Sequence, residues 1–138
     1  MRSISTEAPL FKPDPAAYLP HRNPFLHIDR VLALEPGVSA SGVKKITWEG
    51  VSFPPILLLE AMAQLAGIAA GQREGEGGVL AAIERGNLPA AVNPGDTVLI
   101  VVRIVKAFGR LFLVEGEARV EEATVASATL TLAIGTMQ

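Results

Sequence analysis

The sequence predicts an α+β domain in which an antiparallel sheet packs against one long helix. Residues 56–71 indicate the helix, because this run of aliphatic and small residues carries a single charge, Glu60. Apolar and polar residues alternate along residues 111–120 and 124–134, which is typical of strands with one buried face. The length of 138 residues and the hydrophobic content of 49% suit one domain with a core of its own. We therefore expect one face of the sheet to cover the helix and the other to meet solvent or a partner.

The segment before the helix is expected to hold a short arm and two strands. Three prolines and little periodicity in residues 1–15 predict an N-terminal arm, which leaves 16–138 as a single folded domain. The elements expected next are a short turn or helix over 16–21, strands over 26–34 and 38–47, and a turn over 48–50. Pro54 and Pro55 then open the helix, because proline is tolerated in a first turn, where its missing N–H would be unpaired anyway.

The sequence after the helix predicts a polar loop followed by strands. The expected elements are a loop over 72–78, strands over 79–83, 97–106, 111–120 and 124–134, and turns at 93–96 and 108–110. The sequence Asn-Pro-Gly-Asp at 93–96 is a strong turn signal. These strands make up the expected antiparallel sheet.

Charge and composition exclude several classes of partner. Twelve basic and 14 acidic residues leave a net charge of −2, and Lys44-Lys45 is the one adjacent basic pair, so nucleic acid is not an expected partner. Cysteine is absent, which excludes disulfides and thiol catalysis. No residues lie at metal-ligand spacing, so we expect neither a metal nor another cofactor. The high hydrophobic content predicts that part of the surface is hidden in a homodimer or a larger oligomer.

Targeting signals are not expected. The first 15 residues lack the apolar run of a signal peptide. The run 56–71 is shorter than the ~20 apolar residues of a membrane span. Together with the absence of cysteine, these features predict a cytoplasmic protein without a membrane span.

Three motifs stand in order along the chain. They are LPHRNPFLHIDRV at 19–31, LEAMAQ at 59–64 and NPGD at 93–96. They resemble the opening segment, the central helix and the Pro-Gly-Asp turn of the β-hydroxyacyl-(acyl-carrier-protein) dehydratases, and their spacing holds from about residue 14 to about residue 134. Three motifs in order are a far more specific signal than any one of them.

The resemblance implies a hot-dog fold, in which a long central helix is wrapped by an antiparallel sheet that continues into the sheet of a second subunit. It also implies an acyl tunnel at the dimer interface and a substrate that is an acyl thioester of coenzyme A or acyl carrier protein. In that family, a histidine from one subunit and a helix carboxylate from the other remove water from a β-hydroxyacyl thioester in fatty-acid-type synthesis. Glu60 matches this carboxylate and is the main catalytic candidate. The candidate substrate-binding residues are Phe53, Pro54, Pro55, Ile56, Leu57 and Gln64.

Two departures from the family pattern bear on catalysis. Residues 47–55 span the interval that holds the family's histidine, but the segment is shorter by about ten residues and contains no histidine. Pro55 matches the helix-start glycine whose N–H resembles a donor to the thioester carbonyl, and proline has no N–H. A general base contributes roughly 10²–10⁴-fold and an oxyanion donor roughly 10²–10³-fold. We therefore expect little dehydration by the family's route.

For several other residues, a functional role and a structural role are both conceivable. His21 is a second catalytic candidate, and its place in the opening motif also suits a role in fixing the turn before the first strand. His27 alternates with apolar neighbours and is expected at solvent or at an interface. Asp29 and Arg30 point to opposite faces of a strand and are expected to be structural anchors. Ser52 has neither a nearby histidine nor a glycine-flanked turn, so a nucleophilic role is not expected.

Three functions stay open. The first is a dehydratase or hydratase of the family, and the second is a non-catalytic acyl-binding subunit, alone or paired with an active relative that supplies the histidine. The third is a hot-dog thioesterase in which Glu60 activates water or attacks the thioester.

Residues 85–92 carry one charge, Arg85, so electrostatic steering of an acidic carrier protein is expected to be weak.

Overall fold

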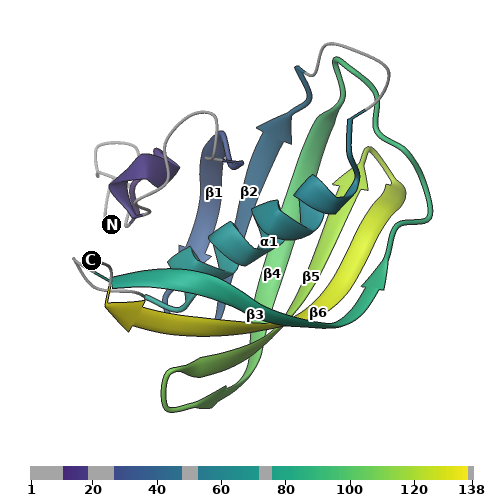
Figure 1. The fold of residues 1–138 in the computed structure, drawn as a ribbon. Coiled ribbons are helices and arrows are strands. Elements are labelled where there is room, and N and C mark those ends of the chain that lie inside the picture. The colour runs from purple at the N-terminus through teal and green to yellow at the C-terminus, as the bar shows by residue number, and fades with distance from the viewer. Residues whose placement is uncertain (1–10, 19–26, 48–52, 72–75, 137–138) are drawn as a thin grey trace, which may run out of the picture.

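The computed structural model describes residues 11–18, 27–47, 53–71 and 76–136. In chain order the elements are η1 (Pro15–Ala17), β1 (Arg30–Glu35), β2 (Ser39–Lys45), α1 (Ile56–Ala69), β3 (Glu76–Asn87), β4 (Thr97–Phe108), β5 (Leu111–Val120) and β6 (Ala123–Thr136). The described strands form one antiparallel sheet of six strands in the order β1-β2-β4-β5-β6-β3. Figure 1 shows α1 lying across one face of this curved sheet. The predicted α+β architecture is confirmed.

Helix α1 begins directly after the two prolines, as predicted, and ends at Ala69 rather than at residue 71. Pro55 occupies the N-cap position without a side-chain hydrogen bond. The N–H groups of Leu57 and Leu58 instead donate to the carbonyls of the two prolines, both at 3.0 Å. At the other end Gly71 adopts a φ of +72°, a left-handed conformation that glycine takes at little cost and that ends the helix.

The covered side of α1 approaches the sheet closely. Met62 and Leu65 on this side are fully buried. Gly116 on β5 lies under Met62, and a Cβ at that glycine would stand 2.8 Å from Met62 Sδ. Gly42 on β2 is equally confined, because a Cβ there would stand 2.9 Å from Arg30 O and 3.4 Å from Leu65 Cδ1. These two glycines let the helix lie at short range from the strands.

The two faces of the sheet differ as predicted. Buried side chains on the inner face include Val98, Ile100, Val102, Val114, Ala118, Leu130 and Leu132. The outer face carries ion pairs instead: Arg103 Nη2 donates to Glu115 Oε1 at 2.5 Å, and Arg119 Nε lies 3.1 Å from Glu117 Oε1. Solvated pairs of this kind contribute little to stability. The stability of the sheet therefore rests on its inner face.

Strand β3 differs most from its predicted bounds, because it covers Glu76–Asn87 and not 79–83. The loop predicted over 72–78 was wrong at its last three residues, which belong to β3. The polar end of the strand pairs with β6, for example Arg85 with Thr129. An edge strand can keep polar side chains in water while its main chain bonds to one neighbour, so the local polarity does not end the strand.

The other bounds differ less. β5 matches its prediction, β4 and β6 run longer than predicted, and β1 and β2 run shorter. Phe108 belongs to β4 rather than to the predicted turn. The turn predicted at 93–96 is present, with the Asn93 N–H donating to Asp96 Oδ2 at 2.8 Å. The turn predicted at 48–50 lies outside the described residues.

The described part of the N-terminal segment is attached to β1. The Val31 N–H donates to Pro13 O at 2.8 Å. Asp14 Oδ1 accepts the Ala16 N–H at 2.9 Å and so caps η1. The later part of the turn predicted over 16–21 lies outside the described residues.

Gly42→Ala should destabilise the fold, because the added methyl group meets the main-chain oxygen of Arg30, which cannot turn aside. Overpacking of this kind costs about 1–3 kcal/mol. Urea unfolding followed by circular dichroism measures the change. Gly135→Ala is the matched control, since nothing lies within 4 Å of a Cβ at that position. Equal stability of the two variants would contradict the close packing of β2 against β1.

Candidate functional site

Glu60 lies one turn after the start of α1 and is half-buried. Its chain neighbours Leu59 and Ala61 are 3% and 0% exposed. Because residues four apart share a helix face, Glu60 lines up with Ile56, which is 53% exposed, and with Gln64. Within the described residues its carboxylate has no hydrogen-bond or ion-pair partner. Glu60 thus lies on the side of α1 that the sheet does not cover. This position explains how a charged residue fits into an otherwise apolar helix.

Gln64 is a buried polar residue on the same helix face, at 3% exposure. Its Oε1 accepts the His27 N–H at 2.7 Å. This bond fastens the segment that enters β1 to α1, one helical turn beyond Glu60. Buried amides are normally paired in this way, so the contact has a structural role. The predicted role of Gln64 in substrate binding stays a prediction.

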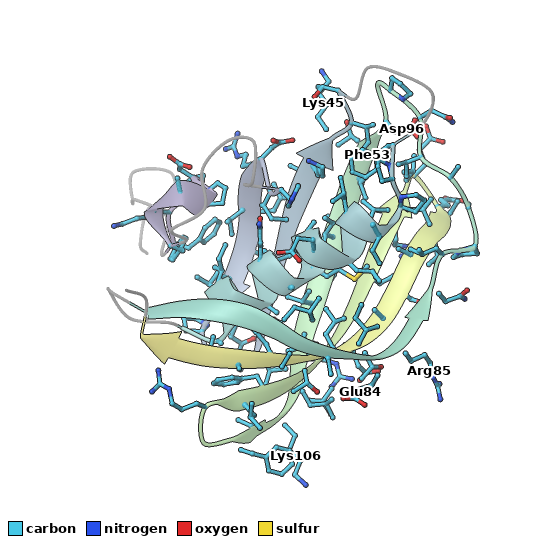
Figure 2. All side chains as sticks on the ribbon, viewed as in Figure 1. Lys45, Phe53, Glu84, Arg85, Asp96 and Lys106 are labelled. Atoms are coloured by element: carbon cyan, nitrogen blue, oxygen red, sulfur yellow. The ribbon has the colours of Figure 1, made fainter. Side chains whose placement is uncertain are left out.

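The segment that enters α1 carries the other predicted binding residues. Phe53 is buried at 4% exposure, and Ile56 is exposed. The half-buried members are Pro54, Pro55 and Leu57. Figure 2 shows Phe53 near Lys45 and Asp96, at the end of the sheet where α1 begins. These five residues thus lie together at the start of α1, before the turn that carries Glu60, whereas Gln64 lies further along the helix.

Lys44 is a residue that the sequence patterns did not single out. It pairs with Val98 across β2 and β4, and paired residues of an antiparallel sheet point to the same face, so Lys44 lies on the inner face. Its ammonium nitrogen stands 5.7 Å from the centre of the Phe53 ring. Burial lowers the pKa of Lys44, and the charge of Asp29 partly offsets this shift. Alternation along the expected strand 38–47 places Lys44 on the same face as Ala40 and Gly42, but the pairing of β2 with β4 is what shows that this face is the inner one.

Asp29 joins the start of β1 to the end of β2. Its Oδ2 accepts the Lys45 N–H at 2.6 Å. Its own N–H donates to Val43 O at 2.9 Å. This geometry agrees with the anchoring role expected for Asp29.

In the described part of the chain, no three His, Asp or Glu side chains lie close enough together to hold a metal ion. No helix of the described residues is long and apolar enough to cross a membrane. The candidates His21 and Ser52 lie outside this part of the chain.

The outer face of the sheet contains an open hollow of about 450 Å³. Its lining includes Arg85, Arg103, Glu115 and Thr129. Figure 1 shows α1 on one face of the sheet, and the hollow lies on the other face, so it is separate from the candidate site on α1.

Curated relatives match most of the chain, although no family model matches it. A protein of Caldanaerobacter subterraneus subsp. tengcongensis, named 3-hydroxyacyl-(acyl-carrier-protein) dehydratase FabZ, is 37% identical over 125 residues, covering 81% of this chain and 89% of its own length. A protein of the same name from Agrobacterium fabrum is 37% identical over 123 residues, covering 80% of each.

Solved structures confirm the predicted hot-dog fold. The dehydratase heterocomplex ApeI:P from Xenorhabdus doucetiae matches with a TM-score of 0.80 and 17% identity, over 89% of this chain and 91% of that chain. A mutant of the fluoroacetyl-CoA-specific thioesterase FlK matches with a TM-score of 0.64 and 18% identity, over 77% of this chain and 91% of that chain. At 17% and 18% identity, these matches show a shared fold.

Gln64→Leu should destabilise the protein, because it leaves the part-buried His27 N–H without the Oε1 acceptor. An unsatisfied buried donor costs about 1–3 kcal/mol. Urea unfolding measures the loss, and amide hydrogen exchange should accelerate at His27. Glu60→Gln, on the same helix face, is the control and should change stability by less than about 0.5 kcal/mol. Similar effects of the two changes would argue against the bond between Gln64 and His27.

The stability of the wild type relative to Lys44→Met should rise with pH between the lowered pKa of Lys44 and its ordinary value of 10.5. In that range the unfolded chain still holds the lysine proton while the folded protein has released it, so raising the pH favours folding. Urea unfolding of both proteins at a series of alkaline pH values measures the difference. Lys45→Met, which removes an exposed lysine from the same strand, should not reproduce the trend. A difference that falls with rising pH would show that the ammonium group is stabilised by its surroundings.

Proposed function

The chain belongs to the 3-hydroxyacyl-(acyl-carrier-protein) dehydratase FabZ family, and we propose that it binds β-hydroxyacyl and enoyl thioesters at the side of α1 that carries Glu60. The observation that supports this most is the position of Glu60, half-exposed on the uncovered side of the helix and next to the exposed Ile56. An acyl thioester bound there would meet an ionisable oxygen and an apolar surface, the two features that such a ligand requires.

Without a partner subunit, we expect this protein to catalyse dehydration only slowly. The chain has two histidines, His21 and His27, and none in residues 47–55, where the family's histidine would lie. Pro55 has no N–H for the thioester carbonyl. Without a general base, the elimination loses roughly 10²–10⁴-fold in rate. The carboxylate of Glu60 then lacks its catalytic counterpart within one chain.

A partner subunit would complete the site. β3 is an edge strand of the described sheet, and strand edges readily pair with other chains. Gly86 on β3 lies against Leu59, whose Cδ1 would stand 3.5 Å from a Cβ at that glycine. A chain bound along β3 would therefore border the helix turn that carries Glu60. The likeness to a dehydratase heterocomplex favours an active relative as this partner, and a homodimer along the same edge is the alternative.

A thioesterase is the second candidate function. It is favoured by the fold likeness to the thioesterase FlK. In this reading Glu60 activates water, or attacks the thioester itself, without a histidine. The half-exposed position of Glu60 suits either role.

Intact-mass spectrometry of β-hydroxybutyryl- and crotonyl-carrier protein tests the proposed activity, and calorimetry with crotonyl-coenzyme A measures binding separately. We expect binding, with water gained or lost at least ~100-fold more slowly than with the Agrobacterium fabrum relative as positive control. Glu60→Gln should abolish the remaining turnover. Glu122→Gln, which removes an exposed carboxylate from the turn between β5 and β6, should leave it unchanged.

Three results would contradict this function. If the protein converts substrate as fast as the positive control, and Glu60→Gln loses this activity, the protein needs no other subunit for dehydration. Release of free carrier would favour the thioesterase. Absence of binding to every thioester would reject the acyl site at α1.

A further inference from the structure

Lys44 is an ionisable side chain on the inner face of the sheet to which the proposed function assigns no role. Gly42 and Ile46, which precede and follow it on the same side of the chain, are both buried. Its cross-strand partner Val98 is fully buried. A lysine in such a row costs free energy, because its ammonium group loses part of its hydration. An interaction with the ammonium group would offset this cost.

The described residues supply little of this compensation. Within the described residues, the Lys44 ammonium group donates no hydrogen bond, and the Phe53 ring lies 5.7 Å away, near the limit of a cation–π contact. Asp29 attracts the charge, but its Oδ2 already accepts the Lys45 N–H at 2.6 Å. The ammonium group can donate three hydrogen bonds, and so it retains capacity for a ligand.

The place of Lys44 in the fold indicates which ligand atom it would meet. Phe53, the residue beside its ammonium group, leads directly into the two prolines and the first turn of α1. The prolines have no N–H, and the N–H groups of Leu57 and Leu58 already donate to main-chain oxygens. A carbonyl oxygen placed at this end of the helix would find no N–H at Pro54 or Pro55, whereas Lys44 offers a charged donor.

We propose that the ammonium group of Lys44 donates a hydrogen bond to the carbonyl oxygen of the bound acyl thioester. The inference rests on the proposed function, because it requires the thioester to lie at the start of α1. A cationic donor in a partly desolvated place polarises a carbonyl more strongly than a neutral N–H does. Polarisation makes the adjacent Cα–H more acidic, and no bond to Lys44 forms or breaks. Lys44 thus takes the place of the main-chain donor that Pro55 cannot provide.

Infrared difference spectroscopy of crotonyl-coenzyme A, labelled with ¹³C at the thioester carbonyl, tests this contact. The labelled C=O stretch should lie at lower frequency when the ligand is bound to the wild type than when it is bound to Lys44→Met. Calorimetry should show about 10-fold weaker binding to this variant, as expected for the loss of one charged hydrogen bond. Lys45→Met is the matched control, because it removes the exposed neighbour on the same strand, and it should behave as the wild type does. Lys44→Arg keeps a cationic donor and should restore part of the frequency shift.

The failure of this inference is distinguishable from the failure of the proposed function. A Lys44→Met variant that binds with wild-type affinity and with the wild-type C=O frequency would overturn the inference and leave the acyl site in place. A wild type that binds no thioester would reject both. Circular dichroism establishes that each variant is folded. If Lys44→Met does not fold, Lys44→Gln replaces it, and its neutral donor should produce a smaller shift than the wild type.

Discussion

The close approach of α1 to the inner face of the sheet is the constraint on which the rest of the structure depends. Gly42 and Gly116 remove the side chains that would hold the helix away from the strands, and Met62 fills the space above Gly116. With the helix so close, its covered side has no room for a hydrated charge. The single charge of α1, Glu60, consequently lies on the opposite side, where a ligand or a second chain can reach it.

Two polar residues near the helix differ in how far their burial is compensated by hydrogen bonds or charges. Gln64 is buried and satisfied, because its Oε1 accepts the His27 N–H, and this contact holds the chain ahead of β1 against α1. Lys44 lies half-buried on the inner face of β2, and among the described residues the distant ring of Phe53 and the charge of Asp29 are what compensates for this burial. A satisfied buried group stabilises one arrangement of the chain, whereas an incompletely satisfied one is a candidate for contact with a ligand.

The edge at β3 connects the fold to the proposed function. Leu59, the neighbour of Glu60, packs against Gly86 on this strand, so the edge of the described sheet and the candidate carboxylate are close together. Strand pairing along that edge would bring residues of a second chain to the uncovered side of α1. In the proposed function, this is how a family member without a histidine in residues 47–55 takes part in thioester chemistry.

The sequence by itself determined the elements with a strong local signal: α1 starts after Pro54 and Pro55, and β5 has the bounds that its alternation predicts. It also identified Glu60, because a lone charge in an apolar run needs no partner element to be noticed. The tertiary structure alone decided the polar end of β3, which is a strand because β6 lies beside it, and the inward position of Lys44, which depends on the register of β2 with β4. Register and burial depend on which residues meet across the sheet, and no local window of sequence contains that information.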